Sequence, residues 1–178
     1  MKNDQKTDDL SGYYLVRAYH KDAHPFATVM DLSREEALDV YKKVAPVVVD
    51  NLAKGKDHLK QRKDIENWLR EGARASGVNV RRENPVYFAL TRDPEAVGAV
   101  LQPMSNAADK KVIVIPAVDA DLSVCSFTYA PHRDVSRTMD EVICNAQQIA
   151  EIVKTYDERA WGRCIAVQMW DKPAHISP

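Results

Sequence analysis

Five polar or positively charged side chains fall on one stripe of a predicted helix between residues 57 and 76. At about 100° per residue, the stripe contains Lys60, Lys63, Asn67, Arg70 and Arg74. The acids of the same segment fall mainly on its flanks. A row of cations on one helix face can attract an acidic protein or a nucleic-acid backbone. A solvated helix face with flanking i,i+4 ion pairs has the same pattern, and the sequence leaves both interpretations open.

This basic segment stands out because the chain as a whole is nearly neutral. The 178 residues include 25 Lys and Arg against 26 Asp and Glu, which gives a net charge of −1. Residues 54–82 hold nine Lys or Arg and four Asp or Glu, whereas residues 134–158 hold two and six. We therefore expect an intracellular interaction or regulatory protein whose basic helix face meets an acidic protein partner, with binding of a nucleic-acid backbone as an alternative.

A second set of candidate residues comprises Arg17, His20, Tyr87 and Arg92. The strand that contains Tyr87 leads into a predicted helix capped by Asp93, where free amides and the Arg92 guanidinium could hold a phosphate-like anion. Arg17 and His20, at the end of the first predicted strand, could line the same edge. The Asp93 cap would satisfy those amides itself, which favours a purely structural role. The alternative function is an enzyme that acts on a nucleotide-like or phosphate-bearing substrate.

The placement of Arg17 or His20 on an early strand and of Tyr87 on a middle strand resembles the mono-ADP-ribosyltransferases. That family combines an Arg or His on an early strand, a Ser-Thr or Tyr element on a middle strand and a Glu on a late strand. The predicted last strand here contains Gln168 and Trp170 but no Glu. The residue on which that transfer chemistry depends is therefore missing from the matching strand.

Several other chemistries lack their sequence signals. The six glycines form no phosphate-binding loop, no HExxH motif occurs, and the three cysteines lack metal-ligand or disulfide spacing. We therefore expect no cofactor and no metal, and we expect Cys144 to be an inert, semi-exposed thiol on the polar side of a helix. The chain has no run of about 20 apolar residues, so we expect a soluble cytoplasmic protein without a membrane partner.

Apolar and β-branched runs predict the strands of a sheet. The predicted strands cover residues 13–19, 86–90, 111–115, 122–129 and 163–170. A further strand at 26–30 could form a hairpin with the first one. Unequal connections between such strands favour a mixed or mostly antiparallel sheet over a doubly wound one.

Capping patterns predict where helices begin and end. The predicted helices cover residues 34–44, 57–76, 94–101 and 139–156. Two capping boxes start the first and last of them, at Ser33 and Thr138, and Gly77 is placed to stop the long helix in a left-handed conformation. Pro46 marks a break, a kink or a new first turn.

Taken together, these elements predict one α+β domain over residues 12–178, preceded by a flexible tail at residues 1–11. A mixed or mostly antiparallel sheet, packed by about four helices, forms the scaffold. The length suits one ordinary domain with a sizeable core.

Overall fold

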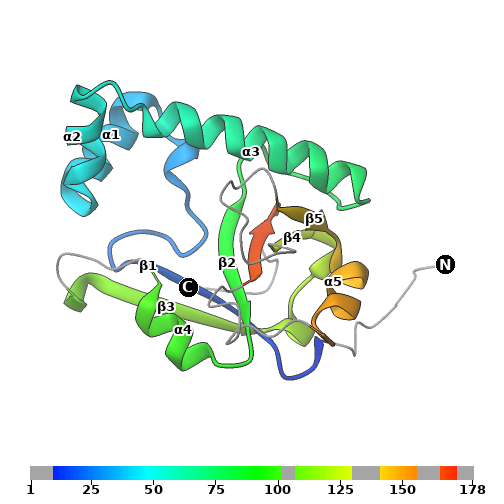
Figure 1. Ribbon diagram of the computed structural model, residues 1–178. Helices are drawn as coiled ribbons and strands as arrows, with labels where there is room; N and C mark the ends of the chain where they lie inside the picture. The colour runs from blue at the N-terminus through cyan, green and yellow to red at the C-terminus, as the bar shows by residue number, and fades with distance from the viewer. Residues whose placement is uncertain (1–9, 102–106, 130–140, 156–164, 172–178) are drawn as a thin grey trace.

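The protein is built around one six-stranded sheet in which every neighbouring pair of strands is antiparallel (Figure 1). The computed structural model describes residues 10–101, 107–129, 141–155 and 165–171. The strands are β1 (Tyr14–His20), β2 (Val86–Thr91), β3 (Lys110–Pro116), β4 (Cys125–Tyr129), β5 (Val142–Cys144) and β6 (Ile165–Met169). Their order across the sheet is β3-β1-β2-β6-β4-β5. The predicted α+β class with an antiparallel sheet is confirmed.

Five α-helices accompany the sheet within the described ranges. They are α1 (Arg34–Val44), α2 (Pro46–Ala53), α3 (His58–Ala75), α4 (Pro94–Val100) and α5 (Ala146–Ile152). Short 3₁₀ helices lie at η2 (Val29–Asp31), η3 (Ala107–Asp109), η4 (Ala117–Asp119) and η5 (Leu122–Val124). None of the helices in the described part of the chain has the length and apolar run that crossing a bilayer requires.

The helix boundaries follow the capping chemistry of the sequence. The Ser33 hydroxyl accepts a hydrogen bond from the Glu36 amide at 3.3 Å, and the Glu36 carboxylate accepts one from the Ser33 amide at 2.9 Å. Pro46 opens α2 in its first turn, where a missing amide hydrogen costs nothing, so the break at this point is a new helix. Gly77 follows α3 with φ of 81°, as its predicted left-handed role requires.

The main core lies between one face of the sheet and α5. Leu15, Phe88 and Val167 point to this face from neighbouring strands, and Ile149 of α5 packs with them. Leu10 is fully buried in the same core, although the sequence places it in the expected tail. The described part of the chain is therefore packed from its first residue onward.

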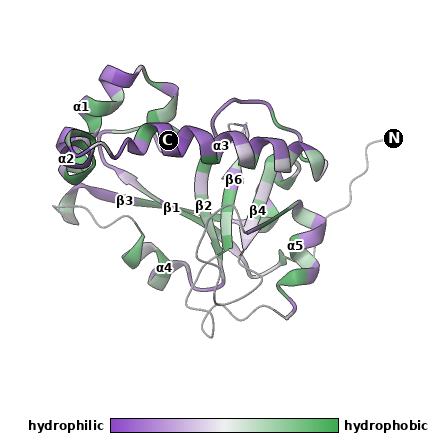
Figure 2. Ribbon diagram, turned by 45° about the horizontal axis from the view of Figure 1, so that its top comes forward, coloured by the Kyte–Doolittle hydropathy of each residue, from purple (hydrophilic) through white to green (hydrophobic). Residues whose placement is uncertain are grey.

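The opposite face of the sheet carries α3 near one end and α4 near the other. Leu69 and Ala73 of α3 pack with Trp170, while Val97 of α4 packs with Val16 and Ala89. Figure 2 shows that α3 lies across the strands and consists largely of hydrophilic residues, of which Lys60, Lys63 and Glu71 are exposed. The sheet therefore holds α3 with its polar surface turned outward.

Two of the predicted strands differ in the structure. Residues 26–30 form no strand; they lead into η2, which Thr28 caps by accepting a hydrogen bond from the Met30 amide. A hairpin partner has no place there, because β2 and β3 already occupy both sides of β1. The predicted strand 122–129 begins with η5, and only its second half is extended.

The predicted helix 139–156 is also wrong in its first part. Val142, Ile143 and Cys144 form β5 at the edge of the sheet, paired with β4, while Thr138 lies outside the described residues. The working capping box is at Asn145 and Gln148, which start α5. Cys144 is consequently buried, with 2% of its surface exposed, and is not the semi-exposed helical thiol that we expected.

Candidate functional site

The basic stripe of α3 divides into two halves with different surroundings. In the C-terminal half, the Arg70 guanidinium donates to the Glu83 carbonyl at 2.9 Å and to Asn67 Oδ1 at 2.7 Å. The Arg74 guanidinium lies 3.0 Å from the Glu71 carboxylate. These cations are therefore engaged within the chain.

In the N-terminal half, Lys60 and Lys63 are exposed. Within the described residues, neither lysine has a hydrogen-bond or ion-pair partner for its ammonium group. The structure thus brings together only two of the stripe's four cations as groups open to an outside ligand.

Both lysines line a pocket of about 380 Å³ between η2, α1 and the start of α3. Its walls combine a basic rim with an apolar interior. The lining residues are Val29, Met30, Leu32, Arg34, Ala37, Asp57, Leu59, Lys60, Lys63 and Asn84. Three of them are cations and only one is an acid, so the pocket carries an excess of positive charge.

The single acid of the pocket is already committed to the protein itself. Asp57 caps α3 by accepting a hydrogen bond from the Lys60 amide at 3.1 Å. The Arg34 guanidinium donates to the two carboxylate oxygens of Asp57 at 2.9 and 3.4 Å. The hydrogen bond from Arg34 and the capping bond hold the pKa of Asp57 below its ordinary value. Asp57 is therefore ionised and paired with Arg34, and it forms no ion pair with Lys60 or Lys63.

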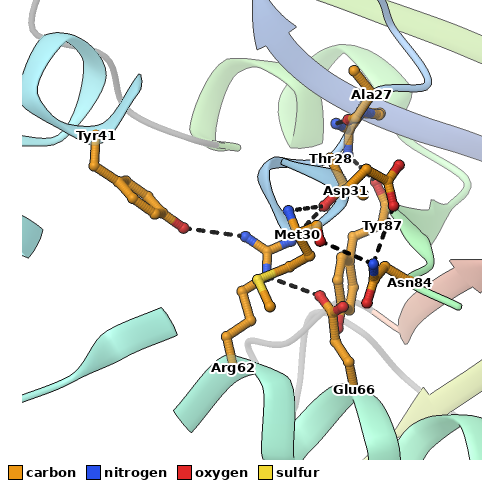
Figure 3. Close-up of polar contacts among 10 residues, drawn as sticks. Ala27, Thr28, Met30, Asp31, Tyr41, Arg62, Glu66, Asn84 and Tyr87 are labelled. Carbon is orange, nitrogen blue, oxygen red and sulfur yellow. Dashed lines mark hydrogen bonds and ion pairs between the residues drawn. The ribbon is translucent and has the colours of Figure 1, made fainter. Parts of the chain in front are cut away.

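A polar network centred on Arg62 fixes α3 relative to its neighbours (Figure 3). Arg62 donates to Glu66 Oε1 at 2.9 Å, to the Tyr41 hydroxyl at 3.4 Å and to Thr28 Oγ1 at 3.3 Å. Its guanidinium also lies 5.4 Å from the centre of the Tyr87 ring. One side chain thus ties α3 to α1, to the segment before η2 and to the sheet.

Glu66 is the most deeply buried member of this network, with 1% of its surface exposed. Burial raises the pKa of Glu66 above its ordinary value, although the charge of Arg62 opposes that shift. Burial, together with the Glu66 charge, also raises the pKa of Tyr87. An ionised Glu66 therefore depends on Arg62 to remain stable inside the protein.

The wall formed by η2 is held by the segment that precedes β2. Asn84 donates to the Met30 carbonyl at 3.0 Å and to Asp31 Oδ1 at 3.1 Å. Arg82 bonds to the Asp31 carboxylate and, at 3.3 Å, to the Phe26 carbonyl. Together with the bonds from Arg62 of α3 and Arg34 of α1, these contacts preform the pocket from three separate segments.

The second candidate set does not form one pocket. Arg17 donates to the Tyr87 carbonyl at 3.1 Å and to the Ala27 carbonyl at 2.8 Å, so it meets the Tyr87 backbone and fills the space beside β1. Burial and the nearby charges of Arg62 and Arg82 lower the pKa of Arg17 to about 10. These contacts give Arg17 a structural role.

His20 and Arg92 lie near opposite ends of the sheet. His20 is at the end of β1 that pairs with Lys110, and Thr91, which precedes Arg92, pairs with Tyr14 at the other end. Tyr14 and His20 are six residue steps apart along β1, roughly 20 Å at the usual rise per residue. The Arg92 guanidinium instead lies over the Tyr13 ring, 4.6 Å from its centre.

Gln168 lies on the late strand where the mono-ADP-ribosyltransferases have a Glu, and it belongs to an internal hydrogen-bond network. Gln168 accepts from the Ser126 hydroxyl at 2.9 Å and donates to Thr128 Oγ1 at 3.0 Å. Trp170 Nε1 donates to the same Ser126 oxygen at 2.9 Å. All four side chains are buried, so they serve the interior of the sheet.

Sequence reasoning missed Arg62, Glu66 and the pocket. The signal for Glu66 is its position on the buried arc of α3, which contains Leu59, Glu66, Leu69 and Ala73. An acid on such an arc, four residues after an arginine, indicates a buried i,i+4 ion pair.

Comparison with known proteins found no matching family model, no similar curated protein and no similar solved structure. Among the described residues, no three His, Cys, Asp or Glu side chains gather as metal ligands. The site is therefore interpreted from its own geometry.

Proposed function

We propose that this protein is a binding module that holds an acidic, partly apolar segment of a partner protein in the pocket between α1, η2 and α3. One observation carries the proposal: Lys60 and Lys63 lie beside an apolar pocket. Both lysines are exposed, and neither has an ion-pair partner among the described residues. The expected ligand has a carboxylate for the lysines and an apolar side chain for the pocket.

The charge of the pocket supports an anionic ligand. Asp57 is neutralised by Arg34, which leaves the two lysine charges without compensation from the pocket wall. Carboxylates that approach such a rim gain affinity mainly through faster association, which added salt slows.

The pocket interior supports a peptide rather than a small inorganic anion. Val29, Met30, Leu32 and Leu59 supply apolar walls that a free phosphate would not use. Burying one apolar side chain there would contribute about 1.5–3 kcal/mol. A methionine in the wall also adapts its shape to different apolar groups.

The bonds that connect α3, α1 and η2 support binding without large rearrangement. Arg62 fixes α3 to α1 and to Thr28, and Asn84 fixes η2. A preformed site avoids the cost of ordering its walls when the ligand arrives.

The proposal is tested with a fluorescein-labelled synthetic peptide in which glutamates flank a central leucine. Fluorescence anisotropy should detect binding to the 178-residue protein, and the variant Lys60→Glu/Lys63→Glu should bind at least about tenfold more weakly, equivalent to 1.4 kcal/mol. Raising the salt concentration should weaken binding to the unaltered protein.

The matched control is Lys43→Glu/Lys54→Glu, which makes the same charge change at exposed positions outside the pocket. This control should bind as the unaltered protein does. An equal loss of peptide affinity in both variants would show that net charge alone causes the effect and would contradict the proposal. Unchanged affinity in Lys60→Glu/Lys63→Glu would contradict it as well.

A further inference from the structure

Strand β3 forms an outer edge of the sheet and pairs with β1 along all seven of its residues (Figure 1). We propose that two copies of this chain associate through β3, pairing the two strands antiparallel about a two-fold axis at Ile113. The inference is independent of the pocket and concerns a different surface of the molecule.

The outward backbone groups of β3 can be identified from bonds at its two ends. The Ala117 amide donates to the Tyr13 carbonyl at 2.9 Å, and the Lys21 amide donates to the Asp109 carbonyl at 2.8 Å. Along a strand, the backbone N–H and C=O groups of successive residues point to opposite sides, so the odd-numbered residues of β3 form the hydrogen bonds to β1. The N–H and C=O groups of Val112 and Val114 therefore point away from the sheet, and no described residue pairs with them.

The side chains along this edge are apolar and exposed. Val112 is 42% exposed, Val114 is 43% exposed, and Val100 at the end of the adjacent α4 is 72% exposed. Natural edge strands are usually shielded by an internal proline, a bulge or charges along their length. Here the charges are confined to Lys110 and Lys111 at one end, and Pro116 is at the other.

A second copy fits this edge because the run Val112-Ile113-Val114 reads the same in both directions. In the antiparallel register, Val112 faces Val114 of the second copy, and Ile113 faces its own counterpart. The outward groups of Val112 and Val114 then bond reciprocally across the axis.

The charges of the strand select the same arrangement. Antiparallel pairing places Lys110 opposite Pro116 of the second copy, whose carbonyl can accept the Lys110 amide. Parallel pairing would put the lysines beside their own counterparts, and like charges directly opposite each other are destabilising.

Sedimentation velocity and hydrogen exchange of the 178-residue protein test this proposal. We expect a species of twice the chain mass whose Val112 and Val114 amides exchange slowly and lose protection on dilution. The Ile113 and Ile115 amides, which face β1, should remain protected in the monomer as well. A protein that stays monomeric up to its solubility limit, with fast exchange at Val112 and Val114, would overturn the proposal.

Two variants separate pairing through β3 from other contacts. Val114→Lys places a charge in the apolar strip, and Val114→Pro removes an amide hydrogen that the monomer does not use. Both should be monomeric while keeping the circular dichroism spectrum of the unaltered protein, whereas Val47→Lys, at an exposed position of α2, should remain dimeric. A dimer that persists in either folded Val114 variant would rule out this interface.

Discussion

Replacing Arg62 by methionine tests whether the buried network holds α3 in place. The substitution keeps an apolar stem but leaves the Glu66 carboxylate, 1% exposed, without its partner. Removing one member of a buried ion pair costs about 3–5 kcal/mol. Arg62 itself is 26% exposed, which places the expected loss at the lower end, about 3 kcal/mol.

Urea unfolding at pH 8 measures this loss as a change in midpoint. With a slope of about 2 kcal/mol per molar urea, a loss of about 3 kcal/mol lowers the midpoint by about 1.5 M. Lys63→Met is the matched control on the same helix, because Lys63 is exposed and should shift stability by no more than about 0.5 kcal/mol. The double variant Arg62→Met/Glu66→Met should regain much of the loss, since no unpaired charge remains.

The pH dependence of the stability loss in Arg62→Met provides a second, independent test. Burial raises the pKa of Glu66, so the folded protein holds that proton more tightly than the unfolded chain does. Stability contributed by this group is present below its unfolded pKa of about 4.3 and falls as the pH rises through the folded pKa. Loss of Arg62 raises the folded pKa further, and the penalty of Arg62→Met should therefore be larger at pH 8 than at pH 5. A penalty equal to that of Lys63→Met, or one that does not change with pH, would refute the reasoning.

Three further predictions concern a close contact of α3, the buried thiol of Cys144 and the cap of α1. Gly72→Ala should destabilise the protein by about 1 kcal/mol in chemical unfolding, because a Cβ at that position would lie 3.3 Å from Ile143 Cβ, which a change of rotamer cannot move away; in an Ile143→Ala background, which removes the 2.2 Å contact with Cδ1, the loss should be smaller. Cys144 should resist alkylation at pH 8 in the folded protein and react in denaturant, as mass spectrometry can determine, because burial raises the pKa of its thiol to about 12. Ser33→Ala should lower stability by about 1 kcal/mol in the same unfolding assay through loss of the α1 cap.

Local chemistry made much of the fold predictable. Ser33 with Glu36 set the start of α1, Asp93 with Pro94 set that of α4, and Gly77 followed α3 as a left-handed stop. Each of these signals acts within a few residues and does not depend on distant parts of the chain.

The failures came where distant contacts decide the outcome. Val142–Cys144 form β5 because β4 offers an edge for pairing, and no local pattern reports that edge. Residues 26–30 form no strand because β2 and β3 already flank β1, which depends on strand order.

The candidate site was predictable in part for the same reason. Helical periodicity alone predicted the basic stripe of α3. It did not predict that the arginines of the stripe are engaged within the chain while its lysines are open. Arg70 is engaged by the Glu83 carbonyl, beyond the end of the helix, whereas Lys63 lines the pocket beside η2. The pocket itself joins three segments, at residues 29–37, 57–63 and 84, that are far apart in the sequence, so only the folded chain reveals it.

Titration of the isotope-labelled protein with the glutamate-leucine peptide, followed by amide chemical shifts, tests the pocket most directly. We predict that the largest shifts fall on Val29–Leu32 and on Lys60–Lys63 and disappear in Lys60→Glu/Lys63→Glu. Shifts confined to the surroundings of Arg74, or spread evenly over the surface, would contradict a binding site between α1, η2 and α3.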